Sequence, residues 1–276
     1  MARQEAKPIP STPTKNFGIY FWAFSSVVER FIDIEKVAGS IPATPTMDIP
    51  ILYQSSNLIA INKPAGVLVH ASEHQKGESF SVVTWLLKQF PRVINVGDDR
   101  IHRPGIVHRL DKETSGVLLV PLTQDYFLYL KKLFQDQKIE KTYQAIVAGT
   151  LEGSRRIDTP IGLVAGTTRR STHGTKMIKS AVTEWVSENI FEREGEWYTL
   201  VRIHPLTGRT HQIRVHMASI HHPVIGDKLY GGKTNAARAS RHMLHCASIS
   251  FRTPLGELVH IDAALPKDFK KILPSA

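Results

Sequence analysis

The sequence predicts an α+β fold whose sheet is mixed and largely antiparallel, with helices on its flanks. Most apolar runs are short and rich in β-branched residues, whereas apolar residues at helical spacing occur in only a few segments. The two kinds of segment do not alternate regularly, as a doubly wound parallel sheet requires. The chain has 276 residues, of which 42% are hydrophobic and 22% charged, and this composition suits a soluble protein of one large or two small domains.

The first expected elements lie around two turns. Residues 51–53 and 58–61 are β-rich runs that flank a polar turn, so they predict two strands. Residues 63–66 (Lys-Pro-Ala-Gly) predict a tight turn, because proline presets the corner and glycine is free to adopt a positive φ. Residues 81–90 then predict a helix. On one side of this helix we expect Val82, Trp85, Leu86 and Gln89.

A polar loop between two apolar runs is the most informative part of the chain. Residues 105–107 and 117–120 are apolar and predict buried strands. Residues 108–116, with the sequence His-Arg-Leu-Asp-Lys-Glu-Thr-Ser-Gly, lie between them and therefore open off the core, where functional residues often lie. The threonine and serine of this loop are expected to form hydrogen bonds within it and so to hold its aspartate in place.

The remainder of the chain predicts one long helix, an irregular segment and several strands. Thr123 predicts the N-cap of a helix that runs to about Gln137, with aromatic and leucine residues at a spacing of three to four. Residues 153–180 are polar, basic and rich in glycine, and they predict a hairpin or a flexible insertion. The other expected elements are strands over 141–148, 180–186, 197–204, 242–252 and 258–264 and a helix over 210–220.

Residues 1–46 differ from the rest, because proline, serine and threonine recur there in a composition that resists packing. Residues 25–30 can be back-translated as AGC TCA GTG GTA GAG CGN, which resembles the D-arm of a tRNA gene. Residues 38–42 can be back-translated as GCA GGT TCG ATT CCN, which resembles the T-arm. The hypothesis is that this extension is either disordered or a read-through of a tRNA gene, with Met47 as the true start of one domain over 47–276.

The charge balance predicts a polyanionic partner. The formal net charge is +10 and the pI is about 9.7, and domains that bind nucleic acid often exceed a pI of about 9. The single cysteine, Cys246, excludes an intrachain disulfide and fits a reducing cytoplasm. No apolar run approaches the ~20 residues that a membrane-spanning helix needs. These observations predict a cytoplasmic protein without a membrane partner.

Four short motifs occur in order along the chain. They are residues 63–66 (Lys-Pro-Ala-Gly), the loop 108–116, residues 141–143 (Lys-Thr-Tyr) and residues 208–216 (Gly-Arg-Thr-His-Gln-Ile-Arg-Val-His). In this order they resemble the KPxG turn, the HRLDxxTSG signature, the short tyrosine motif and the third motif of the RluA family of RNA pseudouridine synthases. The turn and the tyrosine motif are weak alone, but the other two are specific. The resemblance covers nearly everything after Met47.

The resemblance implies the pseudouridine synthase fold, with a central catalytic cleft, and the isomerisation of uridine in structured RNA. The reaction breaks the N1–C1′ bond and rejoins the ring through C5, so it requires no redox change, metal or cofactor. Asp111 is implied as the nucleophile, and Arg214 as the cation beside it that favours an ionised carboxylate. Tyr143 is implied to stack on the target base and to assist in removing the proton from C5.

Five further residues are candidates for contact with RNA or with the target base. They are Arg109, His108, Ile213, Lys63 and Arg209. Arg109 is implied to fill the space that the flipped base vacates, a role that suits its planar guanidinium. Ile213 is expected in the wall of the pocket, although simple packing in the core explains this residue equally well.

Three alternatives are weaker. A retaining glycosidase also uses a carboxylate nucleophile, and Glu113 would supply its second carboxyl group, but a net charge of +10 is ill-suited to neutral glycans. A non-catalytic RNA-binding or ribosome-assembly factor of the same fold would not need the Asp-Tyr-Arg set. A metal site is not favoured, because His211 and His216 are five residues apart and neither CxxC nor HExxH occurs.

The expected partner is RNA, and the protein is expected to act as a monomer. Residues 103–107 resemble members of the family that act on large-subunit ribosomal RNA, so this RNA is the favoured target and tRNA the alternative. The family often carries an S4-type RNA-binding domain ahead of the catalytic one, but residues 1–46 are too few and too irregular to form it. Target selection is therefore expected from the catalytic domain itself, including residues 153–180.

Overall fold

The computed structural model describes residues 48–70 and 80–274 of the chain. Ile49–Ala276 forms one compact unit by itself. The extension over residues 1–46 and the proposed start at Met47 lie outside the described residues, so both stay predictions. None of the helices in the described ranges is long and apolar enough to cross a membrane.

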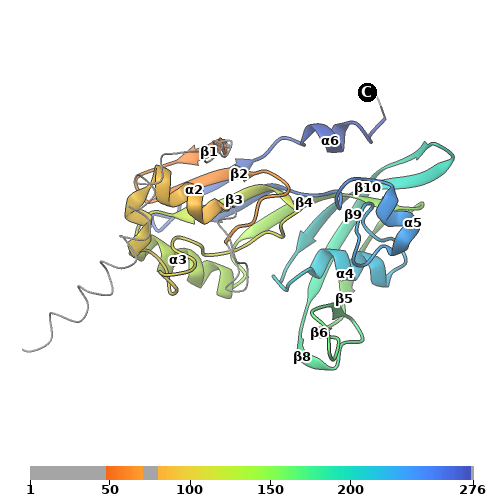
Figure 1. Cartoon of the computed structure of the whole chain (residues 1–276), viewed down its shortest axis with the longest axis horizontal. Helices are drawn as coiled ribbons and strands as arrows, with labels where there is room; N and C mark the ends of the chain where they lie inside the picture. The colour runs from red at the N-terminus through yellow and green to blue at the C-terminus, as the bar shows by residue number, and fades with distance from the viewer. Residues whose placement is uncertain (1–47, 71–79, 275–276) are drawn as a thin grey trace, which may run out of the picture. The chain divides into compact units, whose positions relative to one another are not determined.

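A nine-stranded sheet is the framework of this unit (Figure 1). Its strands are β1 (Ile51–Gln54), β2 (Leu58–Lys63), β3 (Ser115–Pro121), β4 (Glu140–Ala148), β5 (Ser154–Asp158), β9 (Val182–Arg193), β10 (Glu196–Pro205), β11 (Leu244–Arg252) and β12 (Leu258–Asp262). They lie in the order β1-β2-β3-β11-β4-β10-β9-β5, and β12 pairs with β11. Every pairing is antiparallel except that of β3 with β11. The predicted α+β fold with a largely antiparallel sheet is therefore confirmed.

The helices are α2 (Val82–Gln89), α3 (Gln124–Gln135), α4 (Gln212–Ser219), α5 (Gly232–Ala237), α6 (Lys267–Lys270) and the 3-10 helix η2 (Pro91–Asn95). The helices α2 and α3 begin within one residue of the predicted position, whereas α4 begins two residues later than expected. Ser81 and Thr84 form a reciprocal capping box at the start of α2, and Thr123 accepts a hydrogen bond from the N–H of Tyr126 at the start of α3. Of the four residues expected on one side of α2, three are buried and Gln89 is exposed.

β3 is the most deeply buried strand of the sheet, since each of its seven residues is buried. It lies between β2 and β11, and side chains of α2 and α3 belong to the same core cluster as those of β2 and β3. A strand covered on both faces loses the alternation of apolar and polar residues, which explains its unbroken apolar run. The strand gives a fixed base to the polar loop over residues 108–114 that precedes it.

Residues 105–107 do not form the buried strand that their apolar sequence predicts. Gly105 has a φ of +70°, and its N–H donates a hydrogen bond to the carbonyl of Val96 at 2.8 Å. A Cβ atom on Gly105 would lie 2.6 Å from Cγ2 of Val93, so the chain turns at a position that favours glycine. The two apolar residues that follow are half-buried against the core as part of a loop.

The basic segment over residues 153–180 divides between two sheets instead of forming one hairpin. Its first strand, β5, joins the main sheet beside β9. The other strands are β6 (Ile161–Leu163), β7 (Arg170–Ser171) and β8 (Lys176–Lys179), which form a separate three-stranded sheet, called the small sheet below. A Cβ atom on Gly162 would lie 2.7 Å from the carbonyl oxygen of Gly174, so the glycines allow two chain segments to approach closely.

β9 and β10 form a longer hairpin than the strands predicted over 180–186 and 197–204. The chain turns at Glu194 and Gly195, whose φ angles are +55° and +78°. The apolar alternation fades over residues 187–189, which are polar, and the ladder has a register irregularity nearby. Because of these features, the apolar periodicity of the sequence does not show that the strand continues.

Candidate active site

A close contact with β11 positions the polar loop. Gly116, the second residue of β3, has a φ of +115° and pairs in parallel register with Cys246 of β11. A Cβ atom on Gly116 would lie 2.1 Å from the carbonyl oxygen of Cys246, so any other residue would push the two strands apart. The contact brings the loop beside the segment that leads into β11.

Two buried histidines, one just before β11 and one within it, bind the hydroxyl groups at the end of the loop and the start of β3. Oγ1 of Thr114 lies 2.8 Å from Nε2 of His242, and Oγ of Ser115 lies 2.9 Å from Nδ1 of His245. Burial, followed by the charge of Arg214, lowers the pKa of His242 to about 4, so its imidazole is neutral at neutral pH. The expectation that these hydroxyls bond within the loop is wrong, because their partners lie 128 and 130 residues further along the chain.

Lys63 lies beneath the loop and not on a surface that RNA could contact. Its side chain is fully buried, and Nζ donates hydrogen bonds to the carbonyls of Pro64 and Val67 at 2.8 Å and of Lys112 at 3.0 Å. Burial lowers the pKa of Lys63 to about 7. The expected contact of Lys63 with RNA is therefore wrong, since its ammonium group instead ties its own turn to the main chain of the loop.

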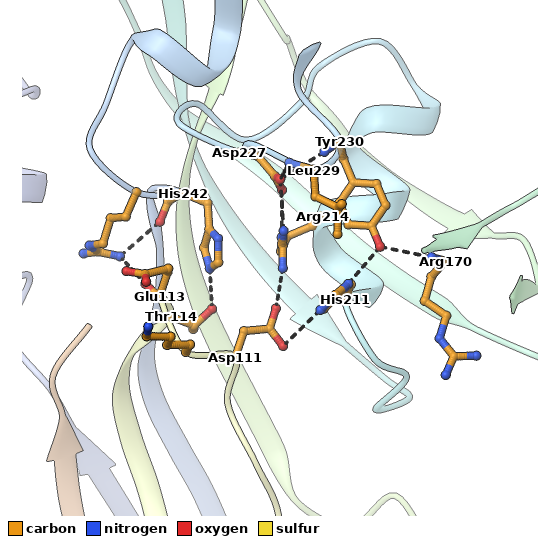
Figure 2. A network of polar contacts seen from close by, with 12 residues as sticks. Asp111, Glu113, Thr114, Arg170, His211, Arg214, Asp227, Leu229, Tyr230 and His242 are labelled. Atoms are coloured by element: carbon orange, nitrogen blue, oxygen red, sulfur yellow. Dashed lines mark hydrogen bonds and ion pairs between the residues drawn. The ribbon is translucent and has the colours of Figure 1, made fainter. Parts of the chain in front are cut away.

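Arg214, in the first turn of α4, is bound between two carboxylates (Figure 2). Its Nη1 donates to Oδ2 of Asp111 at 2.9 Å, while Nε and Nη2 donate to the two oxygens of Asp227 at 2.7 and 3.0 Å. The side chain of Asp227 is 1% exposed and that of Arg214 is 8% exposed, whereas Asp111 is 21% exposed. The structure therefore brings Asp111 and Arg214 together, and Asp111 is the member of the cluster most open to a ligand.

The second carboxylate fixes the charge and orientation of Arg214. Burial raises the pKa of Asp227, but hydrogen bonds from Arg214 and from the N–H groups of Leu229 and Tyr230 outweigh it, so the pKa lies below its ordinary value. Burial likewise opposes the charge of Arg214, but its carboxylate partners outweigh this effect and raise its pKa. The guanidinium also lies 5.1 Å from the ring centre of Tyr230, within the range of a cation–π contact.

Asp227, Tyr230 and His242 are absent from the residues that the sequence predicts at the site. Asp227 lies thirteen positions after Arg214, beyond the end of α4, so no helical spacing connects the two residues. His242 reaches its partner from the segment just before β11. The available signal for Asp227 and Tyr230 was that residues 222–230 extend the resemblance to the third family motif. Sequence alone does not show that Asp227 is buried or that it contacts Arg214.

A cavity of about 340 Å³ opens beside the carboxylate of Asp111. Its wall includes Leu110 of the loop, Phe134 of α3, Tyr143 of β4 and Ile213 of α4. Its volume is close to the lower end of the range for small-ligand pockets. The cavity is therefore suited to one base and not to a stacked pair of bases.

A second cavity, of about 420 Å³, continues the cleft. Arg109, Asp111, His211 and Arg214 line both cavities, so the cation–carboxylate cluster lies where the two meet. The second cavity is also lined by exposed Lys112 and Lys228. Cations in these positions suit the phosphates on either side of a base held in the first cavity.

Tyr143 is half-buried and contributes to the wall of the first cavity from β4. Burial, followed by the neighbouring Cys246 and Asp111, raises the pKa of Tyr143 well above its ordinary value. The phenol therefore keeps its proton at neutral pH. An aromatic ring in this wall can stack on a planar ligand.

His108 has its ring nitrogen engaged by the main chain. Nε2 accepts a hydrogen bond from the N–H of Leu119 at 2.8 Å, and the ring lies 4.8 Å from that of Phe134. Burial and the nearby Lys141 lower the pKa of His108 to about 3, so the imidazole is neutral. His108 lines the first cavity with its ring but carries no charge to attract a phosphate.

The three other candidates for RNA contact also line the first cavity. Ile213 is buried, as expected for a residue of the pocket wall. Arg109 is exposed, and it remains able to move toward a ligand. Arg209 is half-buried, and its Nε donates a hydrogen bond to the carbonyl of Ser180 at 2.8 Å.

Comparisons with known proteins find relatives over most of the chain. The family described as RNA pseudouridylate synthase matches residues 57–219. The chain is 35% identical over 242 residues to the ribosomal large subunit pseudouridine synthase D of Vibrio cholerae, covering 80% of this chain and 69% of the relative. It is 34% identical over 255 residues to an uncharacterized RNA pseudouridine synthase of Aquifex aeolicus, covering 86% of this chain and 78% of the relative. Among solved structures, human RNA pseudouridylate synthase domain containing 1 superposes with a TM-score of 0.66 and 26% identity, over 81% of this chain and 86% of that chain.

Proposed function

Because this chain belongs to the RNA pseudouridylate synthase family, we propose that it converts specific uridines of large-subunit ribosomal RNA to pseudouridine with Asp111 as the nucleophile. The resemblance to the RluA type that its four motifs carry is confirmed. The observation behind the assignment of the nucleophile is the position of one carboxylate. Asp111 is paired with Arg214 at 2.9 Å beside a cavity suited to one base.

The isomerisation exchanges one bond of the nucleotide for another. The N1–C1′ bond breaks, the detached ring turns within the cavity, and C5 bonds to C1′. C5 then loses its proton and N1 gains one, so the product has the composition of the substrate. A carboxylate oxygen of Asp111 attacks C1′ as the N1–C1′ bond breaks, and this ester bond breaks when C5 bonds to C1′, which regenerates the carboxylate. The other carboxylate oxygen stays available to Arg214 throughout.

The target base must leave its stack to reach Asp111. Extrusion costs roughly a few kcal/mol, and stacking on an aromatic ring returns about 1–3 kcal/mol per base. Tyr143 is placed to supply this stacking from the cavity wall. Arg109 is exposed beside both cavities, and its planar guanidinium is suited to stack in the gap that the base leaves in the RNA.

Replacing the hydroxyl of Tyr143 separates stacking from proton transfer. The raised pKa means that the phenol can accept the C5 proton only while it passes its own proton on. We expect Tyr143→Phe to bind substrate RNA as tightly as the wild type and to turn over about 10²–10⁴-fold more slowly, the usual contribution of a positioned acid or base. Single-turnover conversion, measured beside the Kd for the same RNA, tests this.

Tyr143→Leu is the matched variant, because it also removes the ring. We expect it to weaken RNA binding as well as turnover, since a leucine cannot stack on the base. If Tyr143→Phe converts RNA at the wild-type rate, the hydroxyl has no part in moving the proton and only the stacking role stands.

Selection of the target is assigned to the catalytic domain. Arg169, next to β7, and Lys176 and Lys179 of β8 are exposed cations, and cations of this kind bind phosphates. The net charge of +10 supports the same interaction across the surface. We also propose that the protein acts as a monomer in the cytoplasm, where ribosomal RNA is.

The choice of ribosomal RNA rests on the relatives whose printed names specify the large ribosomal subunit. Pseudouridines would be mapped across total RNA from a strain with the gene deleted and from the same strain complemented with the wild-type gene. We expect one or more pseudouridines of large-subunit ribosomal RNA to disappear on deletion and to return on complementation. Loss confined to tRNA would reject the ribosomal target and leave the chemistry unchanged.

A further inference from the structure

His211 adopts a conformation that residues with a side chain rarely use. It is the N-cap of α4, with φ of +58° and ψ of +18°, and its side chain makes no capping hydrogen bond. A left-handed backbone at a residue other than glycine is unfavourable and persists where the surrounding structure imposes it, often at functional sites. Here it accompanies an imidazole whose Nε2 lies 3.8 Å from Oδ1 of Asp111 (Figure 2).

The other nitrogen of His211 belongs to a chain of hydrogen bonds. Nδ1 lies 2.8 Å from the hydroxyl of Tyr230, and the same hydroxyl accepts a hydrogen bond from the main-chain N–H of Arg170 at 3.2 Å (Figure 2). Since the main-chain N–H can only donate, the hydroxyl hydrogen of Tyr230 is free to be donated to Nδ1. This arrangement satisfies all three groups and puts the proton of a neutral imidazole on Nε2, facing Asp111.

His211 is neutral, so it can donate a hydrogen bond to Asp111 without acting as a second cation beside Arg214. Burial lowers the pKa of His211; Asp111 and Asp227 raise it, whereas Arg214 and Arg109 lower it, and the net result is below the ordinary value. The imidazole is therefore neutral at neutral pH. A neutral N–H can orient a carboxylate without adding a second positive charge, which would reduce the electron density available for attack.

The two oxygens of Asp111 thus face different partners. Oδ2 accepts from Nη1 of Arg214, and Oδ1 faces Nε2 of His211. Arg214 alone would fix only one oxygen of the carboxylate. A second contact, from His211 to the other oxygen, limits rotation of the carboxylate. Hydrogen bonds of catalytic groups are often long before the substrate binds and shorten in the complex, so a separation of 3.8 Å is compatible with this function.

We propose that His211 is a positioning residue that holds the Asp111 carboxylate in its attacking orientation, and that Tyr230 and the main chain of β7 fix the tautomer that makes this possible. The proposal rests on the proposed function of Asp111 as the nucleophile. It also connects the small sheet to the reacting group. Arg169, just before β7, donates from Nη2 to the carbonyl of Leu229 at 2.7 Å, so Arg169 and its neighbour Arg170 both bind the segment that carries Tyr230.

The first experiment compares His211→Leu with His211→Gln. Both replacements carry a Cβ atom and meet the same backbone penalty at a positive φ, but only glutamine has a terminal N–H that can reach toward Asp111. We expect His211→Leu to lower kcat about tenfold to hundredfold with KM nearly unchanged, the size of effect that misplacement of a reacting group produces. His211→Gln is expected to recover most of this loss.

The second experiment tests the chain of hydrogen bonds with Tyr230→Phe, which retains the ring near Arg214 and loses the hydroxyl. We expect a smaller decrease in kcat than in His211→Leu. The double variant should be no slower than His211→Leu alone, because both changes break the same connection. In the wild type, ¹⁵N chemical shifts of labelled histidine should show His211 protonated at Nε2, a measurement that requires no variant.

Distinct results separate this inference from the proposed function. The inference is overturned if His211→Leu and His211→Gln have the same kcat, if the Tyr230→Phe and His211→Leu effects multiply independently, or if Nδ1 carries the proton. Each of these leaves Asp111 as the nucleophile as long as its amide variant is inactive. If the amide variant of Asp111 remains active, the proposed function fails first and the role of His211 fails with it.

Discussion

Asp111→Asn is expected to abolish pseudouridine formation, with kcat lower by about 10⁴-fold or more, as for removal of other enzymatic nucleophiles. Asparagine matches the shape of aspartate, and its carbonyl oxygen can still accept the hydrogen bond from Arg214 that the carboxylate accepts at 2.9 Å. The cavity and the loop should therefore persist while the nucleophilic charge is lost. Single-turnover conversion of an RNA that carries the mapped uridine, beside the Kd for that RNA, measures the effect.

Glu113→Gln is the matched control, because it removes a carboxylate from the same loop two residues further on. Glu113 is half-buried and lines only the second of the two cavities described here. We expect its variant to convert RNA within about threefold of the wild-type rate, as is usual for a group outside the chemical step. Conversion by Asp111→Asn at the wild-type rate would remove the basis of the nucleophile assignment. Loss of activity in Glu113→Gln would instead favour chemistry that uses two carboxylates.

Arg214→Met is expected to damage both catalysis and stability. It leaves the carboxylate of Asp227, which is 1% exposed, without its charge partner, and breaking a buried pair in this way costs about 3–5 kcal/mol. It also removes the donor at Oδ2 of Asp111, and we expect kcat to fall about 10²–10³-fold, the effect of losing one preorganised donor. Urea unfolding and single-turnover conversion measure the two losses separately.

The loss of stability should depend on pH in a particular direction. In the wild type the folded-state pKa of Asp227 lies below its unfolded value, so the pair contributes stability above about pH 4 that is lost as the pH falls through the folded pKa. In Arg214→Met, burial raises that pKa, so the variant is most destabilised at neutral pH and the difference from the wild type shrinks in acid. An equal difference at pH 7 and pH 4 would contradict this account.

Arg202→Met provides the comparison for Arg214→Met. Arg202 forms an ion pair with Glu188 on the surface, and its side chain is 50% exposed. Exposed pairs of this kind contribute about 0–1 kcal/mol, so the variant should unfold almost as the wild type does. A similar loss in both variants would mean that arginine packing, and not the buried pair, accounts for the result.

The parts of the fold that sequence predicts are those in which local pattern and burial agree. β3 is an unbroken apolar run and is buried throughout, and Ser81 and Thr123 are hydroxyl residues in front of apolar periodicity and do cap helices. The run over residues 105–107 has the same apolar character but turns at a glycine with positive φ. Hydrophobicity therefore predicts burial better than it predicts the path of the main chain.

The site predicted from sequence lacks the residues that contact its motifs from distant parts of the chain. Its motifs place Asp111, Arg214 and Tyr143 by resemblance, and the structure brings all three to one cavity. Partners such as Asp227 and His242 are joined to these residues only by the folded chain. Lys63 is the opposite case, a residue that the predicted site includes but the structure does not. A lysine in a turn is usually solvated, whereas this one is buried among carbonyl groups.

Because Gly116 pairs with Cys246, the loop that carries Asp111 can take its final position only after β11 has been synthesised. The aspartate loop is made early, but the segment that clamps it follows more than a hundred residues later. While the ribosome is still translating the middle of the chain, the loop has no β11 to rest on. The emerging polypeptide therefore carries Asp111 for about half of translation before the strand that supports its loop has been made.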